Sequence, residues 1–447
     1  MSCFKLGDTL PKSAVGGGTS VKIVPPKDPE KGGVQPDIIV QFRPNKDYLG
    51  KFGFDWLRLG DSKQTLTESD VKYTENVGYH YDDSDSRVGI RYQMKSFKKE
   101  SKLAEKLKKS FKLEGNLTNL STQVTGLDKN FDYRIPVMTL MPKDKILNPH
   151  NVNLVAKLDT FIHTGDKKAK SLRLAYKSND EEDAAKDVIV VNSMSLPNSS
   201  EEGAVSITSK GILKRSVTLY VYADKCHQPC GAIKILRNDK VKQVTSVYIG
   251  VATNINTKDE KTKNVPKINF NELRAKVGQA LVSVNIINFP KLLDMKNKFT
   301  SKNQYLVKNS KGATINTLLN FDSGLLSSMD KELYKQIKSE GLPIPKGEVF
   351  KLYFLEDGAY SPKFKINAGG GGAVGGKSSM FFGDNGNSVG ILAHELGHNL
   401  KLRHTFSHKS DYTYEYKSTD NIMDYTHKDI VYYHWQWKIM NPKGIES

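Results

Sequence analysis

The sequence predicts an α+β protein of several domains, in which a β-rich N-terminal half precedes a mixed α/β domain. Three observations predict this. The chain has 447 residues, more than one ordinary domain needs. Short alternating apolar segments, separated by polar turns, recur between about 132 and 255. Beyond about 256, apolar residues take helical spacing between short apolar runs. We therefore divide the chain into a flexible arm (1–37), a mixed or β domain of unknown role (38–131), a β-sandwich (132–255) and a C-terminal α/β domain (256–447).

The composition indicates folded, basic domains. Hydrophobic residues make up 38% of the chain and charged residues 26%, which is enough apolar material for real cores. The net charge of +18 favours anionic partners, namely nucleic acid, an acidic membrane face or an acidic protein, and does not choose among them. Beside a protein or peptide substrate, we expect an anionic surface or a secretion apparatus as partner, rather than nucleic acid. We find no apolar run long enough for a transmembrane helix and no signal-peptide core. The chain is therefore expected to leave the cell by a non-classical route, or otherwise to stay in the cytoplasm.

The first 131 residues contain few clear elements. Gly, Pro, Lys and Ser dominate 1–37, which indicates the flexible arm. A strand is expected at 37–42 (DIIVQF), and the aromatic segment 52–59 alternates similarly. At 96–114, Leu103, Leu107 and Phe111 recur every four residues among lysines. This spacing predicts a basic amphipathic helix that packs by one stripe; adsorption on an anionic membrane is the alternative.

Short strands are expected throughout 132–255. Their spacing suggests a sandwich, and an immunoglobulin-like arrangement is one form of it, although the Cys–Trp–Cys pattern of antibody domains is absent. The expected strands lie at 152–158, 172–176, 188–191, 217–221 and 246–252.

The three cysteines do not make a disulfide framework. Cys3 stands alone, and Cys226 and Cys230 bracket His227. These last three residues could form part of a metal site, but a local disulfide or two ordinary thiols fits better, because no second cluster lies nearby.

The C-terminal domain has the clearest helix signals. Asn269 can cap a helix that carries Phe270, Leu273, Val277 and Leu281. Ser328 can cap another that ends at Gly341. Strands are expected at 349–355 and 378–382, and the glycine-rich segment 368–376 between them is expected to be a mobile loop. That segment lacks the GxxxxGK[ST] pattern, so it indicates no nucleotide site.

The segment SVGILAHELGHNLKLRHTF carries the chemistry. Residues four apart share one face of a helix, so His394 and His398 present two imidazoles to one point. Imidazole is a good zinc ligand. Glu395 flanks this point and is placed to take a proton from a water there. If the helix ends and the chain turns back, His404 becomes the third ligand, and one position stays open for catalysis.

This pattern, HExxHxxxxxH, resembles the metzincin signature HExxHxxGxxH. Thr405 and Phe406 resemble the HTF ending of pappalysin-like metzincins, and NIMDY at 421–425 resembles their Met-turn. The resemblance implies a metzincin-like catalytic domain over 256–447 with Zn²⁺ as cofactor. It also implies that Met423 lies beneath the metal as a hydrophobic floor and that Tyr425 either ligates the metal or stabilises the oxyanion.

One position departs from the signature. Lys401 stands where the family has glycine, so the turn requires a left-handed backbone at a lysine. If the helix instead ran on, His408 or Asp411 would have to replace His404 as ligand.

The leading hypothesis is a zinc endopeptidase in which Glu395 is the general base, and in which an extended substrate pairs with strand 378–382 at the edge of a sheet. In the alternative, the chain is an exported effector or toxin, delivered for example by a contractile or type VI-like system. The first 255 residues would then dock to the apparatus or to a cell surface, and the peptidase would be the cargo.

Overall fold

The computed structural model of the chain describes most of the residues beyond 37. The predicted arm (1–37), Cys3, Cys226 and His227 lie outside this part of the chain. The described residues are 38–57, 77–80, 97–111, 133–152, 154–164, 171–194, 203–223, 229–253, 268–296, 306–308, 314–318, 323–342, 347–355, 358–361, 366–383, 386, 388–426 and 428–445.

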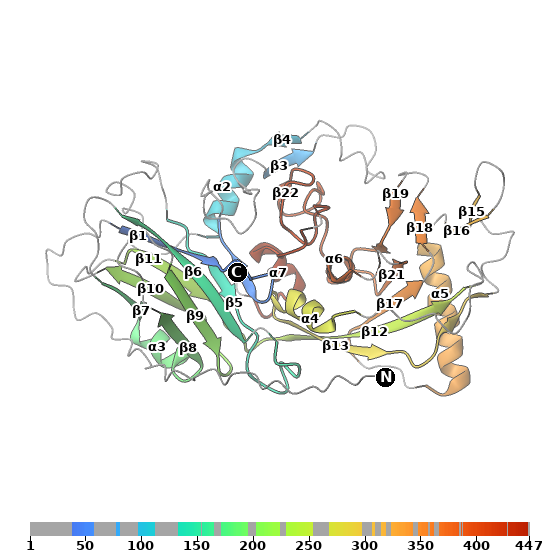
Figure 1. Cartoon of the computed structure of the whole chain (residues 1–447), viewed down its shortest axis with the longest axis horizontal. Coiled ribbons are helices and arrows are strands. Elements are labelled where there is room, and N and C mark those ends of the chain that lie inside the picture. Colours follow the sequence, from blue (N-terminus) through green and yellow to red (C-terminus); the bar gives the residue numbers. More distant parts are fainter. Residues whose placement is uncertain are drawn as a thin grey trace, which may run out of the picture.

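Two sheets form the β-rich half, which lies at one end of the molecule (Figure 1). The first has the order β1-β6-β9-β8, and the second the order β2-β5-β11-β10-β7. Both take their first strand from the segment 38–131, so the sheets are not built from 132–255 alone. The bounds are β1 Ile38–Pro44, β6 Val155–Thr164, β9 Gly203–Ser209 and β8 Ile189–Met194, then β2 Gly53–Asp55, β5 Val137–Thr139, β11 Gly231–Ile235, β10 Val217–Ala223 and β7 Leu172–Tyr176, with helix α3 at Asn179–Ala185.

The strand expected at 246–252 does not join these sheets. It is part of β12 (Lys242–Ala252), which pairs in parallel with β13 (Val282–Asn288) and β17 (Val349–Leu355). The reason is that β12 presents apolar side chains to two different clusters, Val244 and Tyr248 to one and Val247 and Ile249 to the other, as a parallel strand covered by helices on both faces does. Our placement of this strand with the sandwich was therefore wrong.

The sheet that contains β12 has the order β13-β12-β17-β21-β20, with β14 (Leu293–Asp294) beside β12. The strand β21 (Ser378–Phe382) is parallel to β17 and has the predicted bounds. It is not an edge strand, because β20 (Gly370–Gly372) pairs with it antiparallel. The expectation of substrate pairing on 378–382 is therefore wrong, because the edge strand on that side of the described sheet is β20.

The predicted mobile loop at 368–376 is likewise wrong in part, since β20 lies within it. The turn after β20 is also fastened to the end of the helix that carries His394 and His398. The Gly375 N–H donates to the carbonyl of His398 at 2.7 Å, and the Asn399 side-chain amide donates to the carbonyl of Gly376 at 3.0 Å.

Helices cover both faces of this sheet (Figure 1). On one face lie α4 (Phe270–Gly278), capped by Asn269 as predicted, and α6 (Val389–Asn399). The other face is covered by α5 (Ser323–Glu340), which packs Leu325, Met329 and Leu333 onto the sheet. This helix starts before the predicted cap at Ser328, because its apolar stripe already begins at Leu325. It ends before Gly341, which has the left-handed backbone (φ 64°) of a helix terminator.

Smaller elements complete the fold. The short strand β22 (Thr413–Tyr414) pairs with β3 (Val77–His80), and β3 pairs with β4 (Phe97–Lys99). The basic helix is α2 (Ser101–Lys109), which buries Ala104 and Leu107 and leaves most of its lysines exposed. The last helix is α7 (His434–Met440). A further sheet has the order β15-β16-β18-β19, with bounds Leu306–Lys308, Thr314–Leu318, Gly358–Ser361 and Ile366–Ala368.

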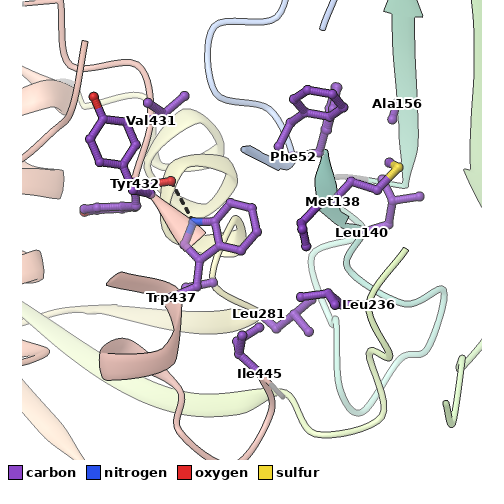
Figure 2. Close-up of a cluster of buried hydrophobic side chains, with 14 of the residues drawn as sticks. Phe52, Met138, Leu140, Ala156, Leu236, Leu281, Val431, Tyr432, Trp437 and Ile445 are labelled. Atoms are coloured by element: carbon purple, nitrogen blue, oxygen red, sulfur yellow. Dashed lines mark hydrogen bonds between the residues drawn. The ribbon is translucent and has the colours of Figure 1, made fainter. Parts of the chain in front are cut away.

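One hydrophobic core joins the two halves of the chain. Figure 2 shows Phe52 and Met138 from the β-rich half facing Leu281 and Trp437 from the C-terminal half. The Trp437 ring is fully buried, and its Nε1–H donates to the carbonyl of Tyr432 at 2.8 Å. Among the described helices, none is long and apolar enough to cross a membrane.

Candidate metal centre

The helix α6 places two histidines one turn apart. Its apolar residues Leu392, Ala393 and Leu396 are buried in the main core, which fixes the helix against the sheet. His394 and His398 then project from the same side, with ring centroids 4.8 Å apart. Both are almost fully buried.

The helix ends in the turn that the third histidine requires. Lys401 has φ 77°, the left-handed backbone predicted from its position. The Lys401 N–H donates to the carbonyl of His398 and the Leu402 N–H to that of Gly397, both at 2.9 Å. These two bonds form a Schellman motif, which usually has glycine at the left-handed position. The lysine side chain lies in solvent, so the strain is confined to the backbone.

The turn brings His404 back to the first two histidines. Its Nε2 lies 3.1 Å from Nε2 of His394 and 3.2 Å from Nε2 of His398. The alternative ligands His408 and Asp411 are exposed and do not belong to this group. The three histidines could together hold a metal ion.

Backbone carbonyls orient the first two rings. Nδ1–H of His394 donates to the carbonyl of Ile422 at 2.7 Å, and Nδ1–H of His398 donates to that of Leu402 at 2.8 Å. With the proton on Nδ1, each Nε2 presents a lone pair to the shared point. This is the usual outer support of a metal-binding histidine, because it fixes both tautomer and ring orientation.

The nitrogen positions fit a zinc ion. Zn–N distances of about 2.0–2.1 Å in a tetrahedral site separate the nitrogens by about 3.3–3.4 Å. The observed separations from His404 are 3.1 and 3.2 Å.

The electrostatic setting keeps the rings neutral. Burial, with a smaller contribution from His398, lowers the pKa of His394 to about 3, and burial lowers that of His398 to about 4. Burial also holds the pKa of His404 well below its usual value. All three rings are therefore in the form that ligates metals at neutral pH.

Glu395 lies beside the histidines and is 6% exposed. Burial raises the pKa of its carboxyl to about 8, and Oε2 has no hydrogen-bond partner among the described residues. A divalent cation nearby would favour the ionised form. The carboxylate lies against β20: a Cβ atom built on Gly372 would be 3.0 Å from Oε2, and one on Gly370 would be 3.1 Å from Glu395 Cγ.

The segment 421–425 lies on the other side of the histidines. Met423 is fully buried against α6, since a Cβ atom built on Gly397 would lie 2.6 Å from its Sδ. The Tyr425 hydroxyl lies 2.9 Å from Nε2 of His404. Burial, and then the charge of Glu395, raises the pKa of Tyr425, so its hydroxyl keeps its proton at neutral pH. The structure thus brings together all six residues singled out in the sequence, His394, Glu395, His398, His404, Met423 and Tyr425.

Sequence reasoning missed the groups that support this centre. The carbonyls of Ile422 and Leu402 leave no trace in a motif. The approach of β20 to Glu395 has one signal in the sequence. Gly370 and Gly372 are two residues apart, so in a strand they share one face, and that face has no side chains to keep a neighbour away.

Comparisons with known proteins add little. No family model matches the sequence, and no curated protein sequence matches it. Among solved structures, the chain is similar to the crystal structure of archaemetzincin from Methanopyrus kandleri, with 12% identity and a TM-score of 0.24 over 46% of this chain and 96% of that chain. A similarity this weak supports no argument about function, so the site is interpreted from its own geometry.

Proposed function

We propose that this chain is a zinc-dependent endopeptidase. The observation that carries the proposal is the convergence of three neutral imidazoles, two of them oriented by backbone carbonyls, beside a buried carboxylate whose Oε2 has no hydrogen-bond partner among the described residues. Structural zinc sites usually have four protein ligands, whereas three ligands and a nearby general base are typical of catalytic sites.

His394, His398 and His404 would hold the zinc ion. When bound, zinc supplies a Lewis acid that polarises the scissile carbonyl and lowers the pKa of the attacking water. Oε2 of Glu395 would accept a proton from an attacking water and deliver it to the leaving amine. The Tyr425 hydroxyl lies 2.9 Å from Nε2 of His404. From there it would donate a hydrogen bond to the developing oxyanion.

The substrate would bind along β20. In the described sheet this strand has a partner only on its β21 side, so its outer edge can pair with an extended peptide. Glu395 lies directly against the same strand, so a peptide paired there would present its scissile bond close to the general base.

The finer assignment to pappalysin-like metzincins rests on Thr405, Phe406 and the NIMDY segment. The Phe406 ring stacks on His404 with a centroid distance of 4.8 Å.

The alternative, in which the first 255 residues deliver a peptidase cargo, predicts two halves of the chain that fold separately. Here β3 and β4 extend a sheet from β22, and Asp55 Oδ2 accepts the His434 N–H of α7 at 2.7 Å. The continuous core of Figure 2 agrees with these contacts. They favour one enzyme whose first half supports the catalytic half.

Two measurements on the full-length chain test the proposal. Mass spectrometry of the purified protein should find close to one zinc per chain, and the protein should cleave peptides from a proteome-derived library. Glu395→Gln should keep the zinc and lose cleavage by a factor of about 100 to 10,000. Cleavage at the wild-type rate by Glu395→Gln, or a wild-type chain without zinc, would refute the proposal.

A further inference from the structure

The first two histidine ligands are oriented in different ways. Nδ1 of His398 binds the carbonyl of Leu402, which belongs to the turn that directly follows its own helix. Nδ1 of His394 instead binds the carbonyl of Ile422, which is remote in the chain. The orientation of His394 therefore depends on what holds the segment around Ile422.

Two buried amides hold that segment. Asn421 Nδ2 donates to Gln436 Oε1 at 2.7 Å, and Gln436 Nε2 donates back to Asn421 Oδ1 at 3.2 Å. Asn421 Oδ1 also accepts the N–H of Met423 at 2.8 Å, which closes a turn around Ile422. Both amide side chains are fully buried.

The helix α7 fixes the outer member of this pair. Gln436 Oε1 accepts the backbone N–H of Tyr433 at 2.8 Å, at the start of α7. The neighbouring Trp437 anchors the helix in the shared core. The N–H of Ile422 donates to the carbonyl of Val431 at 2.8 Å, just before α7. A rigid path thus runs from α7 to the carbonyl that receives Nδ1–H of His394.

We propose that Gln436 is a positioning residue for the metal centre, which acts through Asn421 and the Ile422 carbonyl to orient the His394 imidazole. The inference rests on the proposed zinc site. It does not require that the chain cleave peptides.

The test replaces Gln436 by methionine, which keeps the length of the side chain and removes its hydrogen bonds. The matched control is Asn238→Leu in the β-rich half. Asn238 is also buried, and its side-chain amide also makes three hydrogen bonds, accepting the Leu213 N–H at 2.6 Å and donating to the Leu140 carbonyl at 2.9 Å and to the Ser209 hydroxyl at 3.5 Å. Both variants are expected to lower the melting temperature of the full-length chain, so loss of stability alone does not separate them.

Zinc affinity and His394 do separate them. Loss of an outer hydrogen bond to a metal ligand typically weakens metal binding by about 10- to 100-fold. We expect this loss, measured by competition with a chelator, for Gln436→Met and not for Asn238→Leu. The Nδ1–H resonance of His394 in the zinc-loaded chain should shift or exchange faster in Gln436→Met, while that of His398 should stay in place.

The outcomes are distinct. A Gln436→Met chain that is destabilised like Asn238→Leu but binds zinc within twofold of the wild type would overturn the inference. If Gln436→Met does not fold, Gln436→Glu decides, because it keeps the shape and the acceptor oxygen of the side chain and puts a second carboxylate oxygen where the amide donated to Asn421 Oδ1. A smaller loss of zinc affinity is then expected, and an unchanged affinity would overturn the inference. A wild-type chain that binds no zinc refutes both the inference and the metal site. One that binds zinc and cleaves nothing refutes only the peptidase.

Discussion

Gly372 lies so close to Glu395 that a methyl group on its α-carbon would come within 3.0 Å of Oε2. The same methyl group would lie 2.5 Å from the Ser379 hydroxyl, so it would be crowded by two side chains at once. Gly370, on the same face of β20, would meet Ile391 at 3.0 Å. Glycine at these two positions lets the edge strand lie on the carboxylate without displacing a neighbouring side chain.

Alanine at Gly370 or Gly372 should therefore displace the strand or the carboxylate. A misplacement of about 1 Å near the reacting groups can lower the rate about 100-fold, so we expect kcat/KM to fall at least tenfold with zinc content unchanged. Gly211→Ala is the control, because its nearest heavy atom would be 3.9 Å away. Full activity in Gly372→Ala would show that the strand does not constrain Glu395.

Lys401 supplies a test of the helix end. Lys401→Gly should be neutral or stabilising. It relieves the roughly 1–2 kcal/mol that a left-handed backbone costs a non-glycine residue, and part of this gain is lost because glycine makes the unfolded chain more flexible. Lys331→Gly, at an exposed position inside α5, should instead cost about 1 kcal/mol. Chemical denaturation of both variants gives the sign of the change in the free energy of unfolding for each.

His404→Ala should lose tight zinc binding, because it removes one of the three proposed ligands. An unchanged zinc affinity would leave a shorter two-histidine site.

How much of this site the sequence predicts depends on the range of each interaction. His394, Glu395 and His398 follow from the period of a helix, and the turn at Lys401 follows from the need to return His404. The supports are long-range or lie in the backbone. The carbonyl of Ile422 and the Asn421–Gln436 pair have no spacing rule, because they meet only after α7 has packed.

The fold divides in the same way. The bounds of β17 and β21 match the predicted runs, and Asn269 caps α4 as expected. The strand β12 was assigned to the wrong sheet because a short apolar run does not specify its partners. The strand β20 was missed because glycine disfavours strands, and its pairing with β21 overrides that preference.

The buried imidazole of His434 should make the stability of the fold depend on pH. Burial, with the charges of Lys438 and Lys234, lowers its pKa from 6.5 to about 3, and its Nε2 has no partner among the described residues. Between pH 6.5 and about 3 the unfolded chain binds a proton that the folded chain excludes. The free energy of unfolding should therefore decrease as the pH is lowered through this range, by up to about 1.4 kcal/mol per pH unit. Above pH 6.5 this group has no effect.

The variant His434→Phe keeps a ring beside Trp437 and removes the titration. Its free energy of unfolding, measured in urea from pH 7 to 4, should decline less steeply than that of the wild type. The buried zinc ligands add their own acid sensitivity to both proteins, so the difference between the two slopes is the test. Parallel curves would mean that His434 does not titrate on unfolding in this range.

The last prediction concerns the division at residue 255. A fragment of residues 256–447 lacks β12, which lies between β13 and β17, and loses the seven-residue pairing with each of them. It also exposes the core faces of Leu281 and Trp437 that Phe52 and Met138 cover (Figure 2). We expect it to be insoluble or to unfold without a cooperative transition, and to bind zinc weakly, because α6 rests on that sheet. A fragment that starts at residue 240 restores β12 but still exposes the second surface, so it should gain solubility without reaching the stability of the full-length chain. Circular dichroism, thermal unfolding and zinc content of the three proteins, compared at one concentration, give this ranking. If the fragment 256–447 instead unfolds cooperatively with one tightly bound zinc, the two halves are separable, and the first half is free to serve as a docking or delivery module.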